Sequence, residues 1–134
     1  MNLERYHPVS RVLHWLIAGL IICQYVIAKL AERADSDGEV VRQLALLANH
    51  KSIGMTVLLL VLFRLLVRWV TTVPVYVNAM PAWQSFLSAS VHWLLYGLII
   101  ALPISGWLMS SATDYSVSWF NLFAIPDLLN ADEA

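Results

Sequence analysis

The sequence predicts an all-α membrane protein in which transmembrane helices run up and down in a bundle. Of its 134 residues, 60% are hydrophobic and 13% are charged, whereas soluble proteins are about 45–50% apolar and about 25% charged. The apolar residues also gather into three runs, each long enough to cross a hydrocarbon core of about 30 Å. We therefore expect one transmembrane domain over residues 1–134.

The first run extends from Leu13 to Ala31 and is interrupted only by His14, Gln24 and Lys29. A signal peptide would have a shorter apolar core of about 7–15 residues, followed by a cleavage site with small residues. The run is therefore predicted to be the first span. The charged stretch Glu32 to Arg42 is predicted to connect it to the second.

The second run, His50 to Trp69, has a histidine at one end and Arg64 and Arg68 toward the other. Helix geometry places His50 and Arg64 about 21 Å apart along the axis and within about 40° of each other around it. Gly54 shares this face, where a neighbouring helix or a flat cofactor could approach the backbone closely. Because the chain is already apolar from Val40 onward, the helix could begin several residues before His50.

The third run is predicted to be a helix from about Phe86 to Ser111, with His92 near its start. The preceding stretch, Thr71 to Ser85, contains two prolines and is predicted to be a loop. After Ser111 an aromatic segment is expected to lie at the membrane interface, where aromatic rings are favoured. Its residues are Tyr115, Trp119, Phe120 and Phe123, followed by Pro126.

Charge and cysteine content exclude several kinds of site. A net charge of -1 argues against nucleic acid as a partner. Cys23 is the only cysteine, which excludes an intrachain disulfide, an Fe–S cluster and a covalently attached haem. Any haem must therefore be held noncovalently.

Three histidines, His14, His50 and His92, each lie near the start of one predicted span. Alternating helix directions place His14 and His92 at one membrane face and His50 at the other. A histidine in lipid needs partners for both ring nitrogens, and haem iron on one nitrogen with a carbonyl on the other meets that need. Zinc is disfavoured because the histidines lie too far apart for one tetrahedral site. A cofactor-free bundle with structural histidines remains an alternative. Arg64 could pair with a haem propionate or contact a quinone headgroup.

Four stretches resemble a known family. They are YHPVSRVLHW (Tyr6 to Trp15), HKSIGMTVLLLVLFRLLVR (His50 to Arg68), SVHWLLYGLIIALPISGWLMSS (Ser90 to Ser111) and FAIPDLL (Phe123 to Leu129). In these stretches, which occur in the right order, the chain resembles the prokaryotic cytochrome b561 family. Its members are four-helix dihaem b-type cytochromes of the bacterial inner membrane.

The resemblance implies that two haem b groups are bound, with His14 an axial iron ligand on the cytoplasmic side and His50 one on the periplasmic side. His92 matches a family histidine that is either a ligand or a neighbour of haem and quinone. It also implies a cytoplasmic N-terminus, which charge alone does not decide. The family's fourth helix carries the partner histidines, and the sequence has three spans of the expected four. We therefore expect a C-terminally truncated chain that binds haem weakly, and on the His14 side.

The implied function is electron transfer in the lipid bilayer between a quinone pool and a donor or acceptor at the periplasmic face, with superoxide among the donors. An alternative is a haem-bearing membrane anchor that receives electrons from a partner dehydrogenase. Both interpretations assign the redox chemistry to haem and its binding and tuning to the protein.

Overall fold

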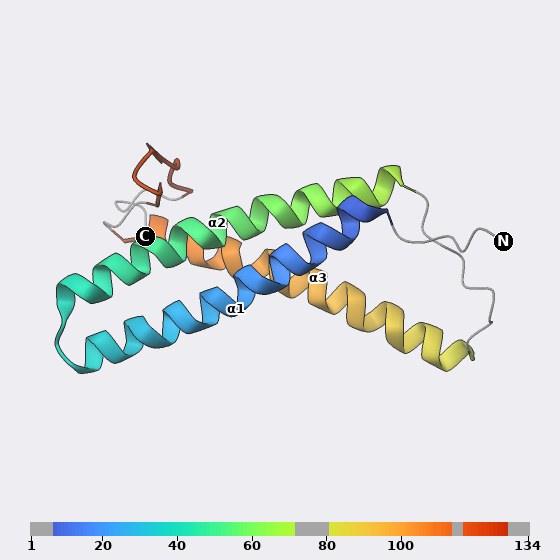
Figure 1. Cartoon of the computed structure of the whole chain (residues 1–134), viewed down its shortest axis with the longest axis horizontal. Helices are drawn as coiled ribbons and strands as arrows, with labels where there is room; N and C mark the ends of the chain where they lie inside the picture. The colour runs from blue at the N-terminus through green and yellow to red at the C-terminus, as the bar shows by residue number, and fades with distance from the viewer. Residues whose placement is uncertain (1–6, 72–80, 114–116, 129–134) are drawn as a thin grey trace.

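The computed structural model describes residues 7–71, 81–113 and 117–128. Three long helices account for most of these residues: α1 (Pro8–Ser36), α2 (Val40–Val70) and α3 (Ala82–Ser111). A short antiparallel hairpin follows, formed by β1 (Ser118–Trp119) and β2 (Phe123–Ala124). All three helices are long and apolar enough to cross a membrane. The predicted all-α membrane bundle is thus confirmed, and successive helices run in opposite directions (Figure 1).

The helix ends follow local signals. Pro8 occupies the first turn of α1, and the His7 side chain accepts a hydrogen bond from the backbone N–H of Val9. At the other end of α1, Gly38 has a φ of 72°. The Glu39 N–H donates to the Ala34 carbonyl at 2.8 Å, and the Gly38 N–H donates to the Asp35 carbonyl at 3.1 Å. These two bonds form a Schellman motif, in which glycine ends a helix at low steric cost.

The turn between α1 and α2 is consequently much shorter than the predicted Glu32 to Arg42 connection. The helices continue through those charged residues, and only 37–39 lie between them. The predicted loop before α3 was also too long, because the helix begins at Ala82 directly after Pro81. The sequence left open whether the second helix begins before His50. It begins at Val40, which places His50 ten residues into the helix.

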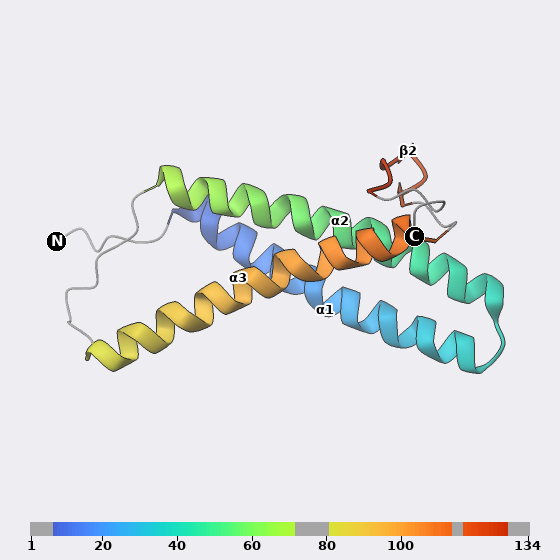
Figure 2. The same ribbon diagram turned by 180° about the vertical axis from the view of Figure 1, so that it is seen from behind.

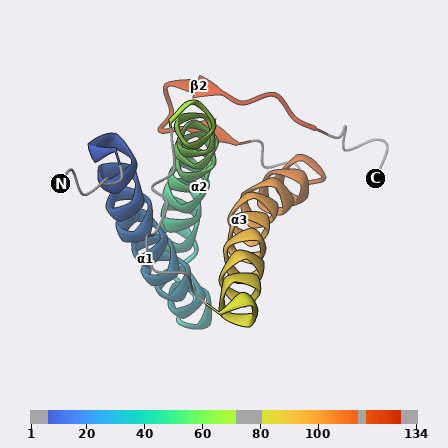
Figure 3. The ribbon, with the colours of Figure 1, turned by 90° about the vertical axis from the view of Figure 1, so that its right-hand side faces the viewer.

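The core is small and centred on α2, which lies between α1 and α3 (Figure 3). One cluster joins Ile17 of α1 to Val57 and Val61 of α2. A second joins Met55 and Leu58 of α2 to Val117, which directly precedes the hairpin. Seen from behind, the C-terminal end of α3 lies against α2, and the two helices diverge toward the N-terminal end of α3 at Ala82 (Figure 2). Much of α3 therefore has no protein neighbour in the described chain.

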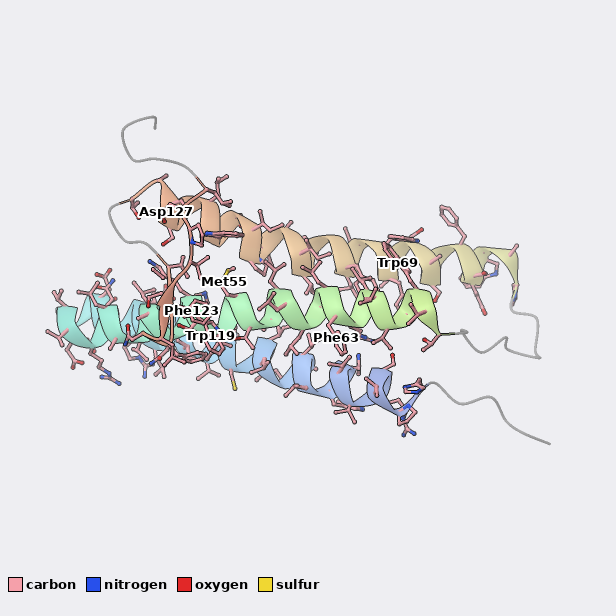
Figure 4. All side chains as sticks on the ribbon, turned by 90° about the horizontal axis from the view of Figure 1, so that it is seen from above. Met55, Phe63, Trp69, Trp119, Phe123 and Asp127 are labelled. Atoms are coloured by element: carbon pink, nitrogen blue, oxygen red, sulfur yellow. The ribbon has the colours of Figure 1, made fainter. Side chains whose placement is uncertain are left out.

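The aromatic segment after α3 forms a hairpin that packs on α2. Figure 4 shows Trp119 and Phe123 toward the end of α2 that is opposite Trp69. The indole N–H of Trp119 donates to the Thr56 hydroxyl at 3.0 Å, and the indole N–H of Trp107 donates to the Pro126 carbonyl at 3.0 Å. Sequence reasoning identified the aromatic character of this segment but not its hairpin. Tyr115 lies outside the described residues.

Candidate functional site

His50 lies at the contact between α2 and α1. The side-chain amide of Gln24 donates a hydrogen bond to the His50 carbonyl, with 2.9 Å between nitrogen and oxygen. His50 is half-buried, yet its Nδ1 atom is fully buried and has no hydrogen-bond partner within the described chain. An imidazole nitrogen in that state is free to donate a proton or to bind a metal.

Gly54 allows this contact to form. A Cβ atom built at Gly54 would lie 3.0 Å from the Gln24 amide nitrogen. The predicted close approach to Gly54 is therefore made by a side chain of the neighbouring helix. His50, Gly54 and Gln24 lie together at the contact between α1 and α2, and we call these three residues the His50 cluster.

Gln24 was not identified as a site residue from the sequence, where it is one of three interruptions in the first apolar run. A polar residue in the middle of a span is costly in lipid and therefore tends to face a partner. That signal was present in the sequence. The identity of the partner depends on how α1 and α2 align, and this alignment comes from tertiary packing.

His14 and His92 belong to the opposite end of the bundle, because they lie in the N-terminal halves of α1 and α3. Both are exposed. The His14 ring contacts Trp15 edge-on, with 5.1 Å between ring centroids. Nδ1 of His92 lies 2.9 Å from the Ser88 carbonyl. Because a carbonyl only accepts, this nitrogen carries the proton, and Nε2 is left as the ring's electron-pair donor.

Arg64 lies near this second end, within the C-terminal half of α2. Its guanidinium carbon is 6.0 Å from the Tyr96 ring centroid on α3, and that of Arg68 is 5.8 Å from the same centroid. Both distances suit cation–π attraction. Within the described residues, the ion pairs are Lys29–Glu32 and Arg42–Glu39 near the α1–α2 turn. Neither arginine has a carboxylate partner there, so each can pair with an anionic group.

The predicted residues thus fall into two groups. The His50 cluster lies toward the α1–α2 turn, whereas His14, His92 and Arg64 lie toward the other end. In the described parts of the chain, no three His, Cys, Asp or Glu side chains gather to hold a metal ion. This pattern suits axial ligation of haem iron, where the porphyrin supplies the other donors.

Comparison with known proteins gives the family of the chain. The family model described as prokaryotic cytochrome b561 matches residues 5–130. Cytochrome b561 homolog 2 of Escherichia coli (strain K12) is 28% identical over 127 residues, which are 94% of this chain and 66% of that protein. The chain thus spans just under two thirds of the length of this relative. The match of the family model over nearly the whole chain shows that the protein belongs to the prokaryotic cytochrome b561 family.

Proposed function

We propose that this protein is a membrane electron carrier that binds b-type haem through His14 near the cytoplasmic face and through His50 near the periplasmic face. Haem supplies the one-electron redox chemistry when it is bound. The observation that carries the proposal is the His50 ring, whose buried Nδ1 atom has no partner within the described chain, so that one ring nitrogen can bind iron while the other donates a hydrogen bond. Membership of the family supplies the identity of the cofactor.

The other residues serve binding in this proposal. Arg64 has no carboxylate partner among the described residues and lies at the His14 end, where it would neutralise a haem propionate. A charged group in a low-dielectric site is stabilised by such a pair. His92 has its Nδ1 proton held by the Ser88 carbonyl, so its Nε2 is available to a haem or a quinone at that end. The electrons would pass between a quinone pool and a periplasmic donor or acceptor, with superoxide as one candidate donor.

Difference spectra test the proposal. The full-length protein should show b-type haem bands when the reduced spectrum is compared with the oxidised one. His14→Ala and His50→Ala should each remove about half of the bound haem, because each ligand serves a different site. Absence of these bands from the folded wild-type protein would contradict the proposal.

A second function is a haem-bearing anchor for a partner dehydrogenase. The α1–α2 turn favours it, because α1 and α2 are 29 and 31 residues long and so extend about 44–47 Å. That exceeds a hydrocarbon core of about 30 Å. The helices therefore extend beyond the hydrocarbon core, and a soluble partner could dock on the charged end that they form at the turn. The exposed charged residues of this end are Lys29, Glu32, Arg33, Asp35, Asp37, Glu39 and Arg42.

Turnover separates the two functions. We expect the purified haem-loaded protein to exchange electrons with a quinone analogue without any added protein. Turnover that requires a dehydrogenase would favour the anchor and contradict independent electron carriage.

A further inference from the structure

The His50 cluster has a geometry that goes beyond a single ligand. In an α-helix the carbonyl of His50 accepts from the backbone N–H four residues later, which is that of Gly54. A carbonyl oxygen has a second lone pair, and the Gln24 amide uses it at 2.9 Å. Because Gly54 has no Cβ, this lone pair is open to α1. The cluster therefore joins α1 to the backbone of α2 at His50 itself.

Two buried atoms of this cluster remain without a partner in the described chain: Oε1 of Gln24 and Nδ1 of His50. The orientation of the amide is fixed, because only its NH₂ group can donate to the His50 carbonyl. Its oxygen is therefore left as an acceptor. Nδ1 of His50 becomes a donor whenever Nε2 is the ring atom that binds a metal. The two unpaired atoms are thus complementary, and they belong to two residues that are already joined by the bond from the Gln24 amide to the His50 carbonyl.

We propose that Gln24 is the positioning residue of the His50 site, holding the His50 backbone through its amide and accepting the Nδ1 proton through Oε1, so that Nε2 faces the iron. This inference rests on the proposed function, in which His50 is an axial ligand. Pairing of the two atoms requires a side-chain rotation, since neither has a partner in the described chain. Gln24 acts through His50 and does not touch the iron.

The proposed bond has a measurable electronic consequence. A hydrogen bond that the Nδ1–H of a ligating histidine donates makes the ring a stronger ligand and fixes its orientation. A stronger donor favours oxidised iron, so the bond lowers the reduction potential of that haem. Removal of the acceptor should raise the potential and weaken haem binding at the His50 site. The site near His14 should not respond.

The test uses Gln24→Leu in the haem-loaded protein. We expect the affinity for haem at the His50 site to fall roughly 10- to 100-fold and the midpoint potential of that haem to rise. Haem bound near His14 reports in the same sample whether the bundle is folded. The matched control is Cys23→Ala, because Cys23 is the preceding residue of α1 and is exposed. It should leave both potentials unchanged.

A double-mutant cycle with Gly54→Ala distinguishes positioning from packing. A Cβ at residue 54 would approach the Gln24 amide to 3.0 Å, so the single variant should displace the amide and change the same potential in the same direction. In the Gln24→Leu background, Gly54→Ala should add no further change, since its effect acts through Gln24. Two effects that add fully would overturn the inference, because additivity indicates independent sites.

The remaining outcomes are also decisive. Wild-type affinity and potential in Gln24→Leu would overturn the role of Gln24 while leaving His50 as a ligand. If Gln24→Leu loses both haems through misfolding, Gly54→Ala alone decides by the same potential measurement. The separate variant His50→Ala tests the proposed function on which this inference rests, namely that His50 is a haem ligand. Retention of both haems in that variant would show that the ligand assignment is at fault.

Discussion

At the scale of single residues, Ser52 holds the C-terminal hairpin to α2 through one hydroxyl group. Its side chain is 2% exposed. The oxygen accepts from the Phe120 N–H at 3.0 Å. It also lies 3.0 Å from the carbonyl oxygens of Ala48 and Ser118, either of which can accept its proton. This one buried hydroxyl thus contacts both β1, at Ser118, and the turn that connects β1 to β2, at Phe120. Because each buried group must keep a partner, the hairpin depends strongly on this side chain.

Substitution of Ser52 by alanine should release the hairpin. The change leaves the Phe120 N–H and the Ser118 carbonyl without their partner, at a cost of about 1–3 kcal/mol. Trp119 would then become more accessible, which is measured by quenching of tryptophan fluorescence together with proteolysis between residues 117 and 128. Ser105→Ala is the matched control, because that hydroxyl is exposed and bonds within its own helix to the Leu102 carbonyl. Equal quenching in the two variants would contradict this role of Ser52.

At the residue level, the sequence placed His50 and Gly54 on one helix face from their spacing. Both lie near Gln24 of α1, and their role in binding a cofactor stays a prediction. Gln24 was passed over because its role depends on which part of α1 faces His50, and twenty-six positions separate the two residues. Spacing along one helix defines a face, but it does not specify what a second helix brings to that face.

At the scale of elements, the α1–α2 turn depends on Gly38. Its φ of 72° lies in the left-handed region, where a residue with a Cβ is disfavoured by about 1–2 kcal/mol. Gly38→Ala should therefore destabilise the helix pair by about 1 kcal/mol and speed hydrogen exchange at the Glu39 amide, which donates to Ala34. Gly38→Asn is the control, since asparagine tolerates this conformation better than alanine does. Equal stability of the two variants, measured by thermal unfolding, would contradict the prediction.

The element bounds show what sequence patterns resolve. Apolar runs predicted three helices correctly, but charge was a poor guide to where they end. The charged residues between Glu32 and Arg42 are mostly helical, because the helix stops at the Schellman motif and not where its polarity changes. The hairpin was missed for a different reason. Its strands are two residues each, and their hydrogen-bond partners Ser52 and Thr56 are more than sixty positions away.

At the scale of the whole molecule, the bundle is organised around α2. It supplies buried residues to both core clusters and a hydrogen bond to the hairpin, and Ile100 of α3 packs against both clusters. Many large apolar side chains on the other helices are exposed, including Trp15 at 72% and Trp93 at 75%. In a membrane such side chains face lipid, which is as apolar as they are. The polar contacts between helices therefore determine which faces meet.

Orientation across the membrane is the last property of the whole molecule, and charge leaves it finely balanced. From the sequence, four basic residues are expected at each end: Arg5, Arg11, Arg64 and Arg68 at one, and Lys29, Arg33, Arg42 and Lys51 at the other. Basic residues near span ends are retained on the cytoplasmic side. We propose a cytoplasmic N-terminus, which places the α1–α2 turn in the periplasm. With an even count, a small change in charge should be enough to reverse some of the molecules.

Single cysteines test this orientation after Cys23, the only natural one, is replaced by alanine. Val41 and Trp83 are 84% and 65% exposed and lie at opposite ends of the bundle. In intact bacteria a membrane-impermeant thiol reagent should label Val41→Cys and spare Trp83→Cys; the reverse pattern would contradict a cytoplasmic N-terminus. Asp35→Lys with Asp37→Lys adds two basic residues at the turn, so a measurable fraction of Trp83→Cys should then become labelled. If labelling stays the same with the added lysines, helix packing determines the orientation and basic charge does not.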